Sequence, residues 1–322
     1  MVLCFLALLS LAYSNTLQNV LRSYETVHKD SISIKYYPGH VILSLQIGGE
    51  SYVATLSPNT YIFHKHFSVD IVREAKTSTL PSPTEGHYTG ALDGLPASLV
   101  SVHIAEGIVT GSIHLEGELY YIEPSWRHVP EPHPYHMLLY KRSDVIYKLG
   151  DPETGQFCGH RSSFEVPANQ SAEHGAPLEY NSSRFKRANS ERSTCEVVLV
   201  ADYKFFTEVG GGSELATKSY MIAIFERITR IFESTQFSTS DRSFSGYGMQ
   251  VKKVVVHTDP SDRADNYNYA GKNWGVSDLL DAFGYGNLPS HEWSGYCLAH
   301  LYTNRDFAAG VLGLAYVASP IR

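Results

Sequence analysis

The sequence of 322 residues lacks most of the features that assign a function to a chain directly. It has no acidic or basic tract of the length that marks a nucleic-acid-binding tail. It contains no nucleophile elbow of the form G-x-S-x-G, no Walker loop and no dinucleotide fingerprint. Beyond its first residues, no segment approaches the roughly 18 consecutive apolar residues that a membrane-spanning helix needs. We therefore expect no nucleic-acid partner, no nucleotide site and no membrane anchor within the printed residues.

Cysteine is also scarce, with four residues in the chain, while the overall composition is that of a globular protein. Hydrophobic residues make up 43% and charged residues 18% of the sequence, and the formal net charge is −7. The chain is long enough for about two domains with sizeable cores.

The first residues predict a secreted protein. An almost unbroken apolar run from Val2 to Ala12 is followed by Ala12-Tyr13-Ser14, which has the small-x-small form of a cleavage site. We interpret residues 1–14 as a signal peptide, and the alternative is a buried first strand or helix. Glycosylation sequons at Asn169 and Asn181 fit the same secretory route.

Residues 15–150 have the pattern of antiparallel β-structure. Val41 to Ile47 alternates between apolar and polar residues, and Gly48-Gly49 then predicts a hairpin turn. Residues 74–88 are rich in Thr, Ser and Pro and are expected to form a loop. A second block predicts a meander of three strands. Those strands are Ser98–His103, Gly107–His114 and Glu118–Ile122.

The pattern changes after a polar stretch, residues 151–194, that we interpret as a linker. The second part alternates strands and helices, which predicts an α/β sheet domain. An amphipathic helix of about five turns is expected there, with Ser213 as a possible N-cap. Its apolar face is formed by residues at helical spacing: Met221, Ile224, Phe225, Ile228, Ile231 and Phe232. The other expected elements are a buried strand Val197–Ala201, a strand Met249–His257, a short helix Ser277–Phe283, a strand Cys297–Thr303 and an apolar segment Val311–Val317.

A basic tetrad inside the linker predicts proteolytic processing. Arg184-Phe185-Lys186-Arg187 has the form Arg-x-Lys-Arg, which suits the acidic pockets of a subtilisin-like, furin-like processing protease. Such a protease needs an exposed, extended segment, and a linker supplies one. Cleavage would separate Arg187 from Ala188. The alternative is a solvated basic cluster.

Three cysteines remain once the signal peptide and its Cys4 have left, and an odd number requires a free thiol or a missing partner. Cys158 lies beside a glycine, upstream of the predicted cleavage site. A thiolate is a strong zinc ligand, so this cysteine could hold an enzyme latent by occupying the open position of a catalytic zinc. The alternative is a buried or mispaired cysteine. Cys195 and Cys297 each begin an apolar strand, but the sequence alone allows all three pairings.

One segment resembles the start of a zinc motif. His291-Glu292-Trp293-Ser294-Gly295 begins like H-E-x-x-H, but the fifth residue is glycine. The motif needs two histidines on one helical face to share a zinc ion. We therefore interpret this segment as an ordinary loop.

Taken together, these features resemble the ADAM metalloproteases, most closely the tumour necrosis factor-α converting enzyme branch, with the Kuzbanian-type α-secretase branch second. The resemblance covers most of the chain after about residue 40. It rests on Tyr121–Arg127, Met137–Lys141, Cys158-Gly159, Arg184–Arg187, Thr194–Asp202, Gly246-Tyr247-Gly248, Cys297–Thr303, Asp306-Phe307 and Gly310–Val317.

The resemblance implies a β-rich pro-domain followed by an incomplete α/β metzincin-like (zincin) catalytic domain. The expected divisions are a signal peptide at 1–14, a pro-domain at 15–150, a linker at 151–187 and the first part of the protease domain at 188–322. It also implies a Zn²⁺-dependent endopeptidase, a type I cell-surface protein that sheds the ectodomains of membrane-protein substrates. Cys158 matches the family's latency cysteine, Arg187-Ala188 the maturation bond, and Cys195 with Cys297 a family disulfide.

The family's zinc motif, H-E-x-x-H-x-x-G-x-x-H, does not occur in these residues, so no catalytic residue is assigned. We expect the chain to be the inactive front part of a longer enzyme. A competing hypothesis is a secreted, truncated isoform whose pro-domain inhibits the full-length protease without catalysing anything. We favour the first, because a chain that stops inside a sheet-forming region would leave a strand edge unpaired.

Overall fold

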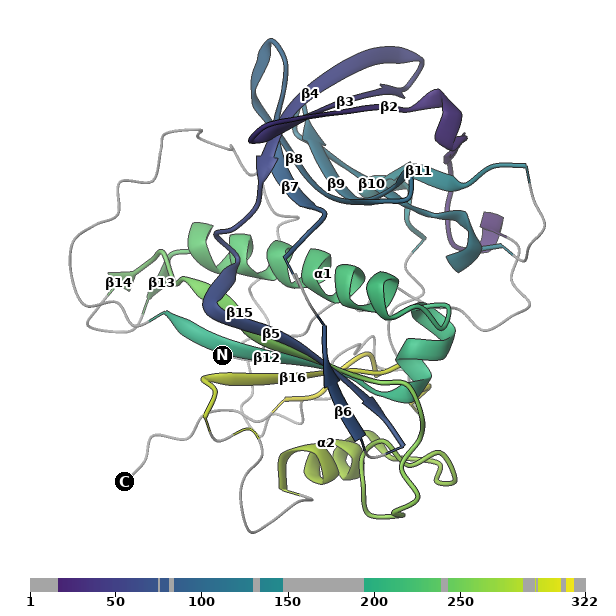
Figure 1. Cartoon of the computed structure of the whole chain (residues 1–322), viewed down its shortest axis with the longest axis vertical. Helices are drawn as coiled ribbons and strands as arrows, with labels where there is room; N and C mark the ends of the chain where they lie inside the picture. The colour runs from purple at the N-terminus through teal and green to yellow at the C-terminus, as the bar shows by residue number, and fades with distance from the viewer. Residues whose placement is uncertain are drawn as a thin grey trace, which may run out of the picture.

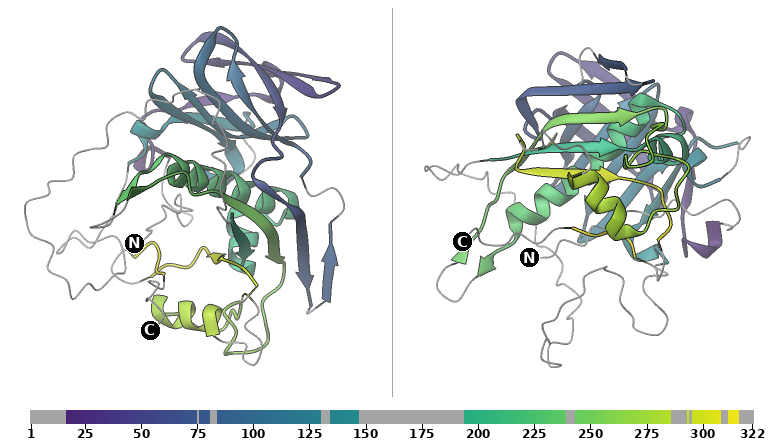
Figure 2. Two further views of the ribbon diagram at one scale, coloured as in Figure 1. Left: turned by 90° about the vertical axis from the view of Figure 1, so that its left-hand side faces the viewer. Right: turned by 90° about the horizontal axis from the view of Figure 1, so that it is seen from below.

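The computed structural model describes residues 17–74, 76–80, 84–129, 134–146, 194–238, 243–285, 293, 295–307 and 311–315. They form four layers, which Figures 1 and 2 show from three sides. A nine-stranded sheet lies on one side of helix α1 (Glu214–Ser234), and a five-stranded sheet lies on the other. Helix α2 (Val276–Tyr285) covers the far face of the five-stranded sheet. No helix in these described ranges combines the length and the apolarity needed to cross a membrane.

The nine-stranded sheet is antiparallel throughout, with the strand order β1-β11-β10-β9-β8-β7-β4-β3-β2. Most of its buried apolar side chains form one core on one face, whereas Tyr121, Leu138 and Tyr140 belong to a second cluster. The strands are β1 Glu25–Val27, β2 Ser33–Tyr37, β3 His40–Ile47, β4 Glu50–Pro58, β7 His87–Leu92, β8 Leu95–Ala105, β9 Ile108–Leu115, β10 Glu118–Pro124 and β11 Met137–Lys141.

Tight two-residue turns set the register of this sheet. Gly48-Gly49, Glu106-Gly107 and Glu116-Gly117 all have positive φ at both positions. That combination makes a turn whose twist matches the strands on either side, and glycine adopts it without strain. The hairpin and the meander predicted from the sequence are both confirmed.

The five-stranded sheet has the order β16-β12-β15-β5-β6. Strands β16, β12, β15 and β5 run parallel to one another, and β6 pairs antiparallel at the edge. The bounds are β5 Phe63–Arg73, β6 Lys76–Thr79, β12 Cys195–Ala201, β15 Met249–His257 and β16 Leu298–Tyr302. A separate two-stranded ribbon joins β13 (Phe237–Ser238) to β14 (Ser243–Phe244).

Two strands of this sheet come from the β-rich first part of the chain. Residues 74–88, expected to form a loop, contain β6 and the start of β7. Strand β6 is Lys-Thr-Ser-Thr and is exposed along its length, so it lacks the apolar alternation that predicts a strand. It exists because it pairs with β5 from Asp70 to Arg73.

The elements predicted for the second part are present. Strands β12, β15 and β16 match the expected positions, as do both helices, and the Ser213 hydroxyl accepts a hydrogen bond from the backbone N–H of Ala216. The apolar segment 311–317 is different: its described residues, 311–315, form no strand.

Successive side chains of β12 point to opposite faces of the sheet, one covered by α1 and the other by α2. Val197 and Leu199 pack in the core beneath α1, whereas Val198 and Val200 pack against the layer that contains α2. A strand covered on both faces must be apolar on both faces, which explains the uninterrupted apolar run of β12.

Candidate functional site

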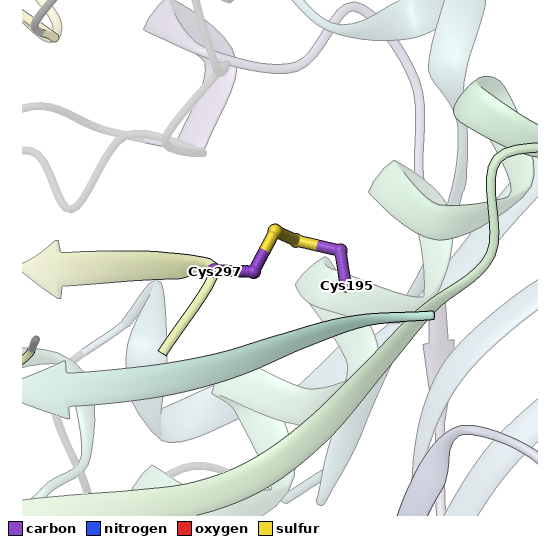
Figure 3. The surroundings of a disulfide bond; sticks show 2 residues. All are labelled: Cys195 and Cys297. Atoms are coloured by element: carbon purple, nitrogen blue, oxygen red, sulfur yellow. A yellow bond between two sulfur atoms is a disulfide. The ribbon is translucent and has the colours of Figure 1, made fainter. Parts of the chain in front are cut away.

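Most of the site residues predicted from the sequence lie outside the described residues. This holds for the signal peptide 1–14, Cys158, the processing residues Arg184, Lys186, Arg187 and Ala188, and the sequons at Asn169 and Asn181. Cys195 and Cys297 are described, and they form a disulfide (Figure 3).

The disulfide joins the starts of two neighbouring parallel strands. Cys195 is the first residue of β12, and Cys297 immediately precedes β16. Beside the bridge, the backbone N–H of Cys297 donates to the carbonyl of Glu196 at 2.8 Å. The bond therefore ties the two ends of a 102-residue stretch at one edge of the five-stranded sheet.

The first part of the chain, residues 17–146, and the second part, residues 194–315, meet in an extensive junction. Strand β5 enters the second part's sheet beside β15, and its residues Phe63, Val69 and Ile71 are buried in the core beneath α1. The nine-stranded sheet covers the opposite side of α1 (Figure 2). The first part of the chain therefore contacts α1 through the nine-stranded sheet on one side and contributes β5 to the core on the other.

Two arginines stack on aromatic rings where the nine-stranded sheet meets α1. The guanidinium of Arg127 lies 4.0 Å from the ring centre of Tyr220, and that of Arg227 lies 4.0 Å from the ring centre of Tyr121. Each part of the chain therefore contributes one cation and one ring. Gly211, with φ +61°, leaves room for the ring of Trp126, which a Cβ at this position would meet at 2.7 Å.

A buried carboxylate organises the charges of this region. Glu123 is 1% exposed, and its Oε2 lies 2.9 Å from Nε2 of His128. Burial acts to raise the pKa of Glu123, but the hydrogen bond from His128 and the charges of His128, Arg127 and Arg227 outweigh it and lower the pKa to about 2. Burial in turn lowers the pKa of Arg127, and the charge of Glu123 opposes that effect.

Two histidines of the nine-stranded sheet lie close to a lysine of α1. The rings of His87 and His103 are 4.6 Å apart, and both residues are buried together with Lys218. Burial, with the charges of Lys218 and Arg127, lowers the pKa of His103 to about 3. Burial also lowers the pKa of Lys218 to about 8, with Glu85 opposing. Burial and the neighbouring positive charges therefore favour the neutral form of the imidazole in this cluster.

A second buried acid secures the C-terminal end of β12. Asp202 is fully buried and accepts a hydrogen bond from the N–H of Phe205 at 2.8 Å. Its other oxygen accepts from the hydroxyl of Thr303 at 2.7 Å and from Nε of Arg305 at 3.2 Å. Burial raises the pKa of Asp202 despite these donors. The acid ties β12 to the segment after β16, a structural role that we did not infer from the sequence.

The described residues do not provide a zinc site. No group of three or more His, Cys, Asp or Glu side chains among them could hold a metal ion. His300, within the segment that follows the disulfide, stacks on Tyr302, and burial lowers its pKa to about 4. The residues present do not fit a catalytic metal, and no catalytic step is assigned to them.

Comparison with known proteins places these observations in a family context. Residues 191–321 match the Reprolysin_5 family, described as Metallo-peptidase family M12. The chain is similar, at modest identity, to ADAM metalloproteases. It is 27% identical to the disintegrin and metalloproteinase domain-containing protein 10 of Rattus norvegicus and 26% identical to that of Homo sapiens, over 96% of this chain in both cases.

The homologue of protein 17 from Caenorhabditis elegans is 25% identical over 84% of this chain. The expected order of the two ADAM branches, with the tumour necrosis factor-α converting enzyme first, is therefore not confirmed. The chain spans 42% of the length of the two vertebrate relatives.

The ADAM-like segment Tyr121–Arg127, which carried part of the resemblance, lies at the junction. Its Tyr121, Trp126 and Arg127 contact the second part of the chain, and its Glu123 is the buried acid. Sequence reasoning missed the role of this segment. The signal available was a cluster of aromatic and charged residues next to predicted strands.

Proposed function

We propose that this chain is the pro-region and the first part of the protease domain of a zinc-dependent metalloendopeptidase of the ADAM type. The product that also carries the zinc motif would shed the ectodomains of membrane-protein substrates from the cell surface as a type I membrane protein. The residues printed here, which lack that motif, would be inactive. What supports the proposal is the match of 191–321 to a metallopeptidase family, together with the shared sheet.

The observation that carries the precursor role is the insertion of β5 into the sheet of the second part. A pro-region that only shielded a finished enzyme would not need to supply strands to it. Here the first part covers one side of α1 with the nine-stranded sheet and extends the five-stranded sheet by two strands. The two parts therefore share one sheet and one core, which supports a precursor in which both are present.

Maturation would begin with removal of residues 1–14 and glycosylation at Asn169 and Asn181. A furin-like protease would then cut between Arg187 and Ala188. In the precursor, the thiolate of Cys158 would ligate the catalytic zinc. When bound, that metal would polarise the scissile carbonyl and activate water.

The latency role of Cys158 predicts a clear phenotype. In a precursor that includes the zinc motif, Cys158→Ala should release measurable hydrolysis of a fluorogenic peptide before any cut after Arg187, because the open zinc position is no longer blocked. The wild-type precursor should be silent until it is cut. Ser162→Ala, a change in the same segment without loss of a thiol, is the matched control and should also be silent. A Cys158→Ala precursor as silent as wild type would remove the thiol from the latency mechanism.

A second candidate function is a non-catalytic inhibitor acting in trans. The specific observation in its favour is that β5 pairs with β15 through backbone and apolar contacts, which need no zinc. Sequencing the native transcript past the codon for Arg322 separates the two proposals. A continuation into H-E-x-x-H-x-x-G-x-x-H favours the enzyme, and a stop codon at that point favours the inhibitor.

A further inference from the structure

Strand β15 has two neighbours in the sheet, and they come from opposite sides of the predicted cut. Strand β12 belongs to the second part of the chain, whereas β5 belongs to the first. Pairing between β5 and β15 runs in parallel from Ser68↔Lys253 to Val72↔His257, after an initial contact at Phe63↔Val251. A cut after Arg187 would turn this pairing into a contact between two separate chains.

The side chains of β5 complete both faces of the sheet. Val69 and Ile71 are fully or almost fully buried beneath α1, and Val72 packs on the opposite face. Asp70 forms an ion pair with the ammonium group of Lys253 at 2.7 Å, and this pair is mostly shielded from solvent. Removal of β5 would expose apolar core residues along β15, together with the unpaired backbone groups of its edge.

Residues before β5 and the last residue of β5 hold the strand against α1. The side-chain amide of Asn59 donates to Glu226 at 3.0 Å in a buried contact, and the hydroxyl of Tyr61 donates to Glu233 at 3.0 Å. The guanidinium of Arg73 pairs with Glu214 at 2.8 Å. We call residues 59–74 and 76–80 the strap, because they cross the end of α1 and then enter the sheet beneath it (Figure 1).

We propose that the edge of β15 is a strand-docking site, that the strap of this chain's own pro-region is its occupant, and that this pairing keeps the pro-region bound after the chain is cut. Added strands of this kind bind through main-chain hydrogen bonds, with pockets for alternate side chains. The role of the pro-region rests on the proposed function, but the docking itself needs neither zinc nor activity.

A backbone hydrogen bond identifies one residue of β5 that makes this contact. The N–H of Thr258 donates to the carbonyl of Val72 at 3.0 Å. Since the N–H and the carbonyl of one strand residue point to the same side, the N–H of Val72 also faces β15. Thr77 lies opposite Val72 on β6, and its own backbone groups therefore point away from β5.

The experiment uses the full chain without its signal peptide, with the site of a sequence-specific viral protease in place of residues 184–187. After cutting at neutral pH, the two fragments of the unaltered chain should co-elute on size exclusion. Val72→Pro removes an N–H that faces β15 and should speed dissociation at least tenfold. Thr77→Pro, on the outer side of β6, is the matched control and should dissociate like the unaltered chain.

Hydrogen–deuterium exchange provides a test that does not depend on a variant folding. In the cut, unaltered chain, the amides of 68–72 and 253–257 should keep the protection that they have before the cut. Separation of the unaltered fragments would overturn the proposal. So would loss of protection in these two stretches while the nine-stranded sheet stays protected, or equal dissociation of Val72→Pro and Thr77→Pro. Failure of the latency prediction for Cys158 would leave all these results unaffected, because none of them measures hydrolysis.

Discussion

Arg127 and Arg227 approach the junction from opposite sides, and each stacks on a tyrosine of the other part of the chain. Arginine is seldom fully buried unless it has partners. Here the partners are aromatic faces together with the buried carboxylate of Glu123. The tyrosine that each arginine contacts is about a hundred positions away in the sequence, so no local pattern marks these residues as interface residues.

Acid should weaken the folded chain through His103. Its pKa is about 3 in the structure, because of burial and the charges of Lys218 and Arg127, and about 6.5 in an unfolded chain. Above pH 6.5 both states are neutral and there is no effect. Below pH 6.5 the unfolded state gains a proton that the folded state does not bind, so the free energy of unfolding falls as pH drops towards 3.

The change His103→Gln should remove this dependence. We expect wild type to lose about 1–2 kcal/mol more than the variant between pH 7.5 and pH 5, from the roughly 1.4 kcal/mol that each pH unit is worth. Urea unfolding at the two pH values measures the difference. His40→Gln, at a partly exposed site stacked on Tyr37, is the control and should keep the wild-type slope. Parallel slopes for His103→Gln and wild type would show that this buried histidine does not govern the acid response.

At the scale of elements, α1 shows how tertiary position overrides an amphipathic pattern. Sequence spacing predicted one apolar face, but the helix lies between two sheets and is buried on both sides. Thr217, Lys218 and Thr229 are therefore buried, whereas Ile231, expected in the apolar face, is 53% exposed. The helix itself was predictable because its period and its Ser213 cap are local features.

Strands β5 and β6 are the elements that local reasoning could not place. Strand β6 is polar and exposed, and β5 is interrupted by a register shift between its contacts at Phe63 and Ser68. Strand β5 pairs with β15, about 180 positions later, and β6 in turn pairs with β5. By contrast, the hairpins of the nine-stranded sheet were predictable, because a turn of two residues determines the pairing on either side.

The disulfide between β12 and β16 should contribute strongly to stability. Cys297→Ser would free a 102-residue stretch in the unfolded chain, and a loop of this length predicts a loss of about 2–5 kcal/mol. Urea unfolding of the variant against wild type measures the loss. The double variant Cys195→Ser, Cys297→Ser should be no weaker than the single one, because the bond is already gone. A single variant as stable as wild type would show that the bridge adds nothing beyond the sheet.

At the scale of the whole molecule, the second part of the chain depends on the first for its outer strands. Residues 188–322 expressed alone should therefore fail to form a stable fold, since the β15 edge and the core beneath α1 lose β5. The free energy of burying Ile62, Phe63, Val69 and Ile71, roughly 1.5–3 kcal/mol each, would also be lost. This is comparable to the whole stability of a small domain.

Two-dimensional amide NMR spectra provide the measurement. We expect dispersed resonances for residues 15–322 and collapsed, narrowly spread resonances for residues 188–322. The longer chain, prepared in the same way, is the control for the quality of the preparation. A well-dispersed spectrum and cooperative melting for residues 188–322 alone would show that the strands of the first part are not needed for folding.

The sequence by itself determined the features that arise from neighbours in the chain. Hairpin turns, helix periodicity, the N-cap and the uninterrupted apolar strand β12 all follow from contacts within a few residues or from burial of both faces. Only the tertiary structure decided which strands share a sheet, that α1 is covered on two sides, and that Tyr121–Arg127 forms part of the junction. The physical reason is that β pairing and the burial of charge depend on partners far away in sequence, and a strand edge carries no mark of the segment that will cover it.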